Sequence, residues 1–366
     1  MRGKFGEHQT VRSILKSLPH TVHDDVTRAG IGEDYARLLL RDGDGGENTG
    51  KTGDADCKNA GAAKSKSVNV ATGVCIDSGY MGLRLDIARL YNSVRIGGYM
   101  PWVATDTIVM PDGSRGHIRV SPVLVATDTI VMPDDDERRM KKLLGKLAGI
   151  CAECGVDIIT GHTEVNTAVS EPIISVTMMG KQSGHSDDAD LCRLKRPVGM
   201  DIVMCGQTGV GGTLQLYYDN QKELFERYSE SYLRPVERME ELILLGRQVD
   251  IALEHGSVYA HDISRGGVFA ALWEMGDALK CGLEVCHDDI PILQETIEIC
   301  EHTGDNPYMI DGCGAALFVV PDGEHLADKL YEAGYEASVI GHLTENSDRV
   351  VVHDEERRFL TPPRYL

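Results

Sequence analysis

The sequence predicts an α/β fold with mixed sheets, divided into two domains. Apolar, strand-like runs alternate with amphipathic, helix-like runs, and glycine-rich turns separate them. At 366 residues the chain is long enough for two domains of ordinary size. A polar stretch at residues 182–190 marks a boundary ahead of Pro197. We therefore expect an N-terminal domain over residues 1–190 and a C-terminal domain over residues 191–366.

The N-terminal part begins with an expected helix at residues 10–18 and an acidic turn at residues 30–34. Residues 42–67 consist mainly of Gly, Asp, Lys, Asn, Ala and Ser, so they cannot bury a core. We expect a flexible surface insertion there. Further along, a helix is predicted over residues 138–154, and it leads into a strand at residues 156–159.

A ten-residue segment at residues 103–112 recurs word for word at residues 125–134. One short repeat does not make a solenoid, so it indicates a local tandem duplication. We expect the second copy to form a buried strand, because it runs directly into a helix, and the first copy to be displaced. Each copy carries an aspartate, Asp106 or Asp128, which is interpreted as a strand-edge residue in preference to a metal ligand.

The remaining elements continue the alternation of strands and helices. Strands are predicted at residues 173–179, 201–204, 315–320 and 337–341. A glycine turn at residues 209–213 precedes a helix, and further helices are predicted at residues 236–255 and 323–333.

The composition limits the classes of partner. The chain holds 57 acidic and 37 basic residues, which gives a formal net charge of −20. Such a charge argues against nonspecific binding to nucleic acid or to an anionic membrane, although a local basic pocket for phosphate is compatible with it. No apolar run approaches the roughly 18 residues of a membrane span, and the first residues lack a signal peptide's apolar core. We expect a cytoplasmic protein.

The ten cysteines are scattered along the chain. Cys151 and Cys154 form a C-x-x-C pair inside a predicted helix, and a zinc site would need a second pair at suitable spacing. Reduced, partly buried thiols are therefore favoured over a redox or metal pair, which stays as an alternative.

Two glycine-flanked polar motifs carry the candidate chemistry. The first, Gly-His-Thr-Glu-Val at residues 161–165, follows an apolar strand. The second, His-Asp-Ile-Ser-Arg-Gly-Gly-Val at residues 261–268, precedes a predicted helix. Each places groups that can hold metal or phosphate beside glycine, where the backbone can approach a ligand closely.

With the segments at residues 31–36, 172–181, 199–204 and 339–345, these motifs make the chain resemble the aminoimidazole ribonucleotide (AIR) synthase superfamily. That superfamily includes hydrogenase maturation dehydratases, thiamine-monophosphate kinase and selenophosphate synthetase, and the likeness is greatest to the hydrogenase-maturation-like branch. The resemblance covers nearly the whole chain. It implies a two-domain fold, a homodimer whose N-terminal sheets form a shared barrel, and an ATP and Mg²⁺ site near that interface.

The resemblance also implies roles for the first-domain residues. Asp34, with Glu33, and Glu164 would hold magnesium, whose preferred ligands are oxygens. Asp34 could instead be a turn acid that caps a backbone amide. Gly161, His162, Thr163 and Asn92 would contact the nucleotide, although a structural hydrogen bond is an equal alternative for His162.

In the second motif the resemblance implies a catalytic group made of His261, Asp262, Ser264 and Arg265. Gly266 and Gly267 would allow a tight turn whose amides face an anion at the helix N-terminus. A capping role without a ligand is the alternative for Ser264.

The chain departs from the family pattern at two carboxylates. Gly73 stands where the family strand ends in Thr-Asp, and Ser93 replaces the aspartate of an Asn-Asp pair. Each aspartate would normally hold magnesium, so the expected metal site has lost two ligands. Asp77 and Asp86 lie nearby and could take the place of the two lost acids, but the sequence gives no strong reason to assign them that role. No thiol stands near the C-terminal end, where the dehydratases carry their reacting cysteine.

Two hypotheses follow. The first is an ATP-dependent enzyme that activates an unidentified small molecule by phosphoryl transfer, mainly through positioning and charge stabilisation. The second is a degenerate homologue that keeps the fold and the dimer and binds nucleotide or a partner protein without turnover. The two motifs favour the first hypothesis, and the lost carboxylates favour the second.

Overall fold

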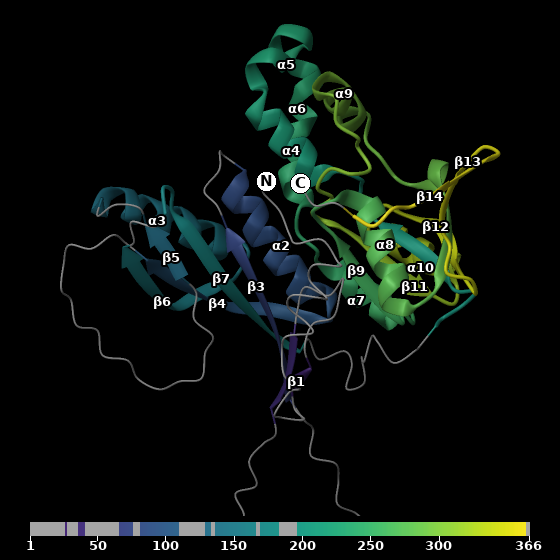
Figure 1. Ribbon diagram of the computed structural model, residues 1–366, viewed down its shortest axis with the longest axis horizontal. Coiled ribbons are helices and arrows are strands. Elements are labelled where there is room, and N and C mark those ends of the chain that lie inside the picture. Colours follow the sequence, from purple (N-terminus) through teal and green to yellow (C-terminus); the bar gives the residue numbers. More distant parts are fainter. Residues whose placement is uncertain are drawn as a thin grey trace, which may run out of the picture.

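The computed structural model describes residues 26–27, 36–40, 66–75, 81–109, 129–132, 136–165, 169–182 and 196–363. Within these residues the strands form two seven-stranded sheets, one from residues 26–182 and the other from residues 201–359. Figure 1 shows the first sheet on the left and the second, with its helices, on the right. This arrangement confirms the expected mixed α/β class.

The first sheet is mixed, and its strand order is β1-β2-β3-β7-β4-β5-β6. Strand β4 runs parallel to β5 and β6 and antiparallel to β7, which is also antiparallel to β3. Two helices pack on this sheet and close a core with Leu83, Ile87, Leu147 and Ile174. The elements are β1 (Val26–Thr27), β2 (Ala36–Leu40), β3 (Lys66–Cys75), α2 (Gly82–Ile96), β4 (Tyr99–Val109), β5 (Thr129–Met132), α3 (Glu137–Glu153), β6 (Asp157–Val165) and β7 (Ile173–Gln182).

The second sheet has the strand order β14-β13-β10-β12-β8-β11-β9, and strand β11, between β8 and β9, is buried throughout. Its strands are β8 (Asp201–Cys205), β9 (Tyr259–Ile263), β10 (Gly282–Cys286), β11 (Ala315–Val320), β12 (Ala337–Thr344), β13 (Arg349–His353) and β14 (Glu356–Phe359). The helices of this half are α4 (Val210–Asp219), α5 (Gln221–Arg227), α6 (Glu230–Arg238), η2 (Met239–Leu242), α7 (Arg247–Glu254), α8 (Gly267–Leu279), η3 (His287–Asp289), α9 (Gln294–Thr303) and α10 (Gly323–Glu332).

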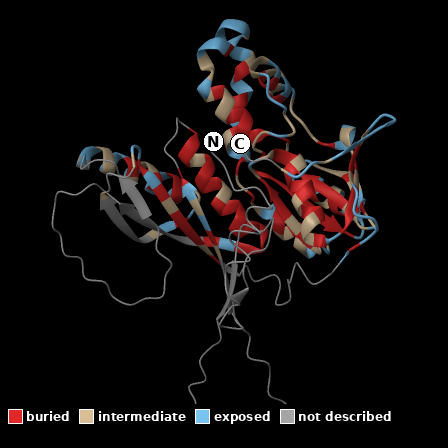
Figure 2. Ribbon diagram, in the orientation of Figure 1, coloured by how far each residue is buried: buried red, intermediate tan, exposed pale blue. Residues whose placement is uncertain are grey.

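Helix α2 joins the two halves and is buried over almost its whole length, as the red helix beside the first sheet shows in Figure 2. Leu83 and Ile87 face the first sheet, whereas Leu85 and Ala88 pack in a cluster with Leu214 of α4. A helix with apolar residues on both sides must be covered on both sides. Side chains of α2 are therefore placed between the two sheets, where a site can draw on both.

The sequence located most helices and strands correctly. The predicted helix at residues 138–154 is α3, whose Asp136 side chain caps the backbone amides of Arg138 and Arg139. The strands predicted at residues 173–179, 201–204, 315–320 and 337–341 are β7, β8, β11 and β12, and the helix at residues 323–333 is α10. The expected helix at residues 10–18, the turn at residues 30–34 and most of the proposed insertion lie outside the described residues. Residues 66–67, assigned to that insertion, instead begin β3.

For the duplicated segment, the expected strand in the second copy is present, but the expected displacement of the first copy is wrong. The first copy is not displaced, because its residues 103–109 lie in β4, the longest strand of the sheet. The second copy contributes only the short strand β5 at residues 129–132. The two copies pair with each other in parallel through Val109 and Val131, and both also pair with β6 and β7. The sheet thus uses both copies as neighbouring strands.

Two other predictions need correction for physical reasons. The helix expected at residues 236–255 is interrupted, because backbone groups of Ile243, Leu245 and Gly246 bond to α2 side chains instead of continuing a helix. The glycine turn at residues 209–213 is mostly the first turn of α4. A Cβ on Gly212 would lie 2.6 Å from the Cβ of Ile310, so this glycine serves close packing. In the described part of the chain, no helix has the length and apolarity needed to cross a membrane.

Candidate functional site

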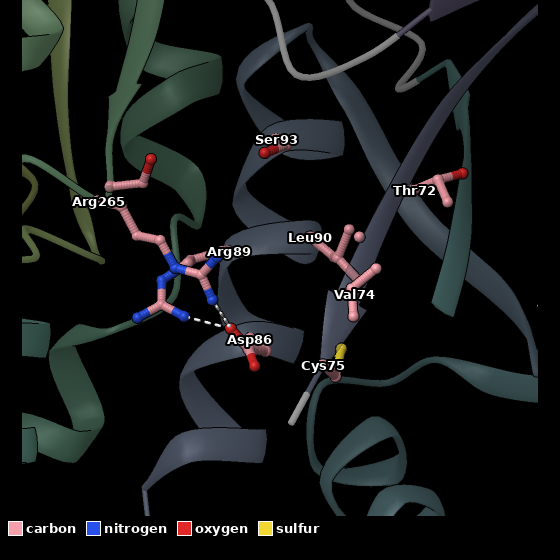
Figure 3. A pocket seen from close by; sticks show the side chains of 10 residues that line it. Thr72, Val74, Cys75, Asp86, Arg89, Leu90, Ser93 and Arg265 are labelled. Atoms are coloured by element: carbon pink, nitrogen blue, oxygen red, sulfur yellow. Dashed lines mark hydrogen bonds and ion pairs between the residues drawn. The ribbon is translucent and has the colours of Figure 1, made fainter. Parts of the chain in front are cut away.

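A pocket of 320 Å³ opens where the two halves meet, and three segments form its walls (Figure 3). The end of β3 supplies residues 72–75, α2 supplies one polar face, and the turn between β9 and α8 supplies Ser264 and Arg265. The lining residues are Thr72, Gly73, Val74, Cys75, Asp86, Arg89, Leu90, Ser93, Ser264 and Arg265. The pocket therefore combines the second polar motif with both positions where the sequence lacks an expected carboxylate.

The second motif separates into two pairs of residues with different surroundings. Ser264 and Arg265 line the pocket, whereas His261 and Asp262 are buried in β9 and do not line it. The Nε2 atom of His261 lies 3.2 Å from a carboxylate oxygen of Glu274, so this histidine contacts α8. Successive strand residues point to opposite faces, which places Asp262 on the other side of β9. The structure thus supports pocket contact for Ser264 and Arg265 only.

Glycine is required in the turn that presents Arg265. Gly266 and Gly267 both have positive φ, at 89° and 68°. A Cβ on Gly267 would lie 2.4 Å from the carbonyl oxygen of Tyr308, a contact that real Cβ atoms do not make. The backbone amide of Gly267 donates to the carbonyl of Ser264 at 3.0 Å. The expected tight strand-to-helix turn is therefore present, and it fixes Ser264 and Arg265 at the pocket.

Four charged side chains are called the charged cluster here: Asp86, Arg89 and Arg265, which line the pocket, and Asp311, which contacts Arg89. Arg265 donates to Asp86 Oδ1 at 2.5 Å, and Arg89 contacts the same oxygen (Figure 3). Arg89 also donates through Nε to Asp311 at 2.6 Å. Two carboxylates and two guanidinium groups balance in charge, and they link α2 to the second half of the molecule.

Arg89 is held in its cationic form. Burial alone lowers the pKa of Arg89, but the carboxylates of Asp311 and Asp86 outweigh that effect and raise the pKa above its ordinary value. Cys75, on the opposite wall, behaves differently. Burial, and then the charge of Asp86, raise the pKa of its thiol well above the ordinary value, so it is a poor nucleophile.

The residues that line this pocket, as far as the structure describes them, are better suited to bind an anion than a bare cation. Asp86 is its one carboxylate among the described residues, and two guanidinium groups already occupy it. Arg265 is 42% exposed and has guanidinium N–H groups beyond the one bound to Asp86. The hydroxyl groups of Ser93 and Ser264 add further donors. Phosphate oxygens match such a set of donors.

The two departures from the family pattern lie in the same pocket. Gly73 is on β3 and Ser93 is on α2, and both line the cavity. The two positions that lack an expected carboxylate therefore belong to one site. Asp86, one of the two nearby acids that were left without a role, lines the same cavity, and Asp77 lies outside the described residues.

Sequence reasoning named Asp86 as a nearby acid without assigning it to the site, and it missed Arg89 and Asp311. A signal for Asp86 and Arg89 was present, because they recur with Ser93 at helical spacing within residues 82–96. Polar residues at this spacing share one face of a helix, where they can line a common site. Asp311 stands in a loop without a periodic pattern, and only the folded structure places it beside Arg89.

Asn92, which the resemblance linked to the cofactor, has a different role in this structure. Its side chain is buried, with Nδ2 donating to the carbonyl of Ile243 at 2.8 Å and Oδ1 accepting from the amide of Leu245 at 2.7 Å. Both ends of the amide thus hold α2 to the second half, and Asn92 is not among the residues that line the pocket.

The first motif lies within a strand instead of in a loop after it. Residues 161–165 are the second half of β6, where His162 pairs with Thr107 and Glu164 with Val109 of β4. The side chains of Gly161, His162, Thr163 and Glu164 lie outside the described part of the structure, as do Glu33 and Asp34 altogether. Their contacts with nucleotide and metal stay predictions.

The C-x-x-C pair lies at the end of α3. Cys151 is buried, and partial burial raises the pKa of the Cys154 thiol. A raised pKa lowers the thiolate fraction that metal binding and redox chemistry require. These surroundings favour the interpretation as ordinary buried thiols.

Comparisons with known proteins agree with the resemblance. The N-terminal domain of AIR synthase related protein matches residues 121–182, and the C-terminal domain matches residues 198–354. A putative hydrogenase expression/formation protein of Methanocaldococcus jannaschii is 26% identical over 274 residues, which cover 74% of this chain and 72% of that protein.

Two solved structures are similar over most of the chain. A hydrogenase maturation protein HypE in complex with ATP has a TM-score of 0.60 at 17% identity, covering 86% of this chain and 88% of that chain. A ThiL protein of Aquifex aeolicus, complexed with AMPPCP and TMP, has a TM-score of 0.59 at 17% identity, covering 96% and 94%. At such identities these two structures show a shared fold. Because the two domain models together match more than half of the residues in the family's order, the chain belongs to the AIR synthase-related protein family.

Proposed function

We propose that this protein is an ATP-dependent enzyme that binds Mg-ATP and activates a small substrate by phosphoryl transfer. The observation that carries the proposal is the convergence of Arg89, Ser264 and Arg265 on one pocket between the two halves. Support also comes from two relatives of the same fold, one bound to ATP and one bound to AMPPCP. Hydrogenase maturation is the biological setting that HypE and the hydrogenase expression/formation protein favour.

In this proposal the two arginines receive the phosphate groups. A guanidinium group matches phosphate geometry through paired N–H donors, and the positive charge offsets charge that spreads over the transferred phosphoryl group. Arg265 is the more accessible of the two, whereas Arg89 is held in place by Asp311. Ser264, at the same turn, is positioned to donate to the nucleotide or to the substrate.

Binding of a magnesium ion would depend on residues outside the described lining of the pocket. Asp86 is engaged by two arginines, so the described residues do not by themselves fit Mg²⁺. We propose Glu33, Asp34 and Glu164 as its ligands, with Gly161, His162 and Thr163 beside the phosphates. When bound, the ion would offset phosphate charge. A homodimer with a shared barrel, a nucleotide cleft near its interface, and a cytoplasmic location belong to the same proposal.

A second candidate is a homologue that binds nucleotide, or a partner protein, without turnover. The specific observation in its favour is that Gly73 and Ser93 both line the pocket where the family would place carboxylates. A site with fewer magnesium ligands can retain phosphate contacts and lose catalysis.

Calorimetric titration with ATP, in the presence and absence of Mg²⁺, followed by a phosphate-release assay, tests the proposal. We expect Arg265→Ala to weaken ATP binding by roughly tenfold or more, because a charge-assisted contact is lost. Arg234→Ala is the matched control, since Arg234 is exposed on α6 and is not among the residues that line the pocket. Asp34→Asn should remove much of the Mg²⁺ dependence and leave metal-free binding unchanged.

The outcomes separate the two candidates. Mg²⁺-dependent binding with phosphate release supports an enzyme, whereas binding without release supports the second candidate. Equal binding by the wild type and Arg265→Ala would remove the pocket from the proposal, and no binding under any condition would overturn ATP as the ligand.

A further inference from the structure

A second group of polar residues lies at the far edge of the second sheet, away from the charged cluster. Strands β10 and β13 run parallel there, with Cys286 opposite Val352. The next residues along the two strands are His287 and His353, so the ladder brings them to the same end of the sheet. Asp288 follows His287 in η3. These three residues are called the His–Asp–His cluster.

The three side chains already converge on one point. Asp288 Oδ1 lies 2.7 Å from His353 Nδ1 and 3.2 Å from His287 Nδ1. One ligand atom from each residue lies within 4.8 Å of the other two, and the described residues contain no other such group of three.

The geometry points to a binding site for a divalent transition-metal ion of the Zn²⁺ type, and we propose that His287, Asp288 and His353 are its ligands. Imidazole nitrogen and carboxylate oxygen are the usual protein ligands of such ions. Metal–ligand bonds near 2 Å place adjacent ligand atoms of a tetrahedron roughly 3.3 Å apart. The separations of 2.7 and 3.2 Å are close to that spacing, so small side-chain rotations suffice.

One aromatic side chain packs against the ring of His287, and a second aromatic side chain stacks on the first. Phe269 of α8 stacks on Tyr308 with ring centres 5.3 Å apart, and Tyr308 lies 4.6 Å from the ring of His287. The His287 and His353 rings are 4.9 Å apart. Packing of this kind restricts ring orientation, which lowers the entropic cost of binding an ion.

The cluster also opens onto a cavity. His287 and His353 both line a pocket of 670 Å³ whose other walls are mainly apolar, with Phe269, Tyr308 and Leu360 among them. Three protein ligands leave a fourth tetrahedral position for water or a bound molecule, as catalytic zinc sites do. Gly266 lines this cavity, while the preceding residues Ser264 and Arg265 line the first pocket. The two sites therefore lie on either side of one turn.

A second histidine pair provides an internal contrast. His255 and His325 approach to 3.2 Å between ring nitrogens on another part of the surface. No carboxylate joins them in a three-ligand group among the described residues. If paired histidines alone were enough for metal binding, this pair should bind as well as the His–Asp–His cluster.

The test uses the full-length protein, stripped with a chelator and kept reduced, and titrated with Zn²⁺ by calorimetry and with Co²⁺ by visible absorption. We expect one site whose affinity falls by roughly tenfold or more in Asp288→Asn and in His353→Gln, because each removes a ligand. Asp289→Asn, in the same short helix, and His325→Gln, in the contrasting pair, are the matched controls. Both should bind like the wild type.

The bound Co²⁺ should show visible bands of tetrahedral nitrogen and oxygen ligation without a thiolate charge-transfer band. Unfolding curves of the metal-free variants establish that each is folded, and they do not require ATP or any activity. The proposal is overturned if Asp288→Asn and His353→Gln bind metal as tightly as the wild type, if the controls lose binding equally, or if the spectrum reports cysteine ligation.

Discussion

The charged cluster and the His–Asp–His cluster are built from the same kinds of groups but differ in burial. Asp86 is 8% exposed and Asp311 is 10% exposed, and each is paired with a guanidinium group. Asp288, by contrast, is 57% exposed and is held by two imidazoles. Buried charges must be paired within the protein, whereas exposed ones keep access to water and ions. The first cluster therefore holds the two halves together at the wall of the first pocket, whereas the second is exposed to solvent.

The buried polar contacts between the two halves continue along α2. Arg95 is fully buried, and its Nη2 atom contacts both Asp250 Oδ2 at 2.5 Å and the Gly246 carbonyl at 3.0 Å. Asn92, one turn earlier, also bonds across to the second half. Arg89, Asn92 and Arg95 all come from α2, so the junction and the pocket share a helix.

The largest expected effect is at this junction. Asp250→Asn removes the charged partner of Arg95 and leaves a buried cation, which costs about 3 kcal/mol of folding free energy. Urea unfolding curves of the variant and the wild type measure the loss. Asp328→Asn is the control, because Asp328 is exposed on α10 and its change should cost little. Equal stability of Asp250→Asn and the wild type would mean that Arg95 is solvated or paired elsewhere in solution.

The junction also explains which parts of the fold the sequence could predict. Helix α3 was found because its apolar spacing reports one buried face, and β11 was found because its six residues form a continuous apolar run. The break in the helix predicted at residues 236–255 was missed, because it depends on contacts with α2 side chains about 150 residues away. The duplicated segment was misjudged for a similar reason, since identical local sequences enter different strands according to their neighbours.

The candidate site was predictable to the same extent. Ser264, Arg265 and the glycines beside them stand in one short motif, and the structure places the first two at the pocket. Asp311 came from a loop with no motif, so its role depended on a contact that only folding creates. The cluster of His287 and His353 was also missed, because parallel strands bring together residues far apart in sequence.

The next effect concerns the positions where carboxylates are missing. Restoring both, with Gly73→Asp and Ser93→Asp, should strengthen Mg²⁺-dependent ATP binding by roughly tenfold, because hard cations prefer carboxylate oxygens. The new side chain at position 73 first meets Leu90 Cδ2 at 3.0 Å, which is the end of a flexible side chain that can move. Calorimetric titrations with and without Mg²⁺ measure the change.

The pair Gly73→Asn and Ser93→Asn is the matched control, since it has nearly the same shape without the charge. If Mg²⁺-dependent ATP binding becomes tighter in the aspartate pair and not in the asparagine pair, the lost metal ligands belong at these positions. If both pairs behave like the wild type, or if both lose binding, the two positions do not control magnesium and the comparison with the family fails there.

The smallest effect is expected at the exposed cluster in the absence of metal. The pKa of Asp288 lies below its ordinary value of 3.8, because His287 and His353 donate hydrogen bonds to the carboxylate. A lowered pKa in the folded state contributes stability above the unfolded value, and this contribution disappears as the pH falls through the lower folded value. Asp288→Asn should therefore be slightly less stable than the wild type above about pH 4, near the unfolded pKa of an aspartate, and the two should converge at more acidic pH. Urea midpoints measured from pH 6 to pH 3 with a chelator present check this, with Asp289→Asn as the control that should follow the wild type. A difference that is constant with pH would show that Asp288 acts through packing, and it would weaken the contrast between an exposed, ligand-ready cluster and the buried junction.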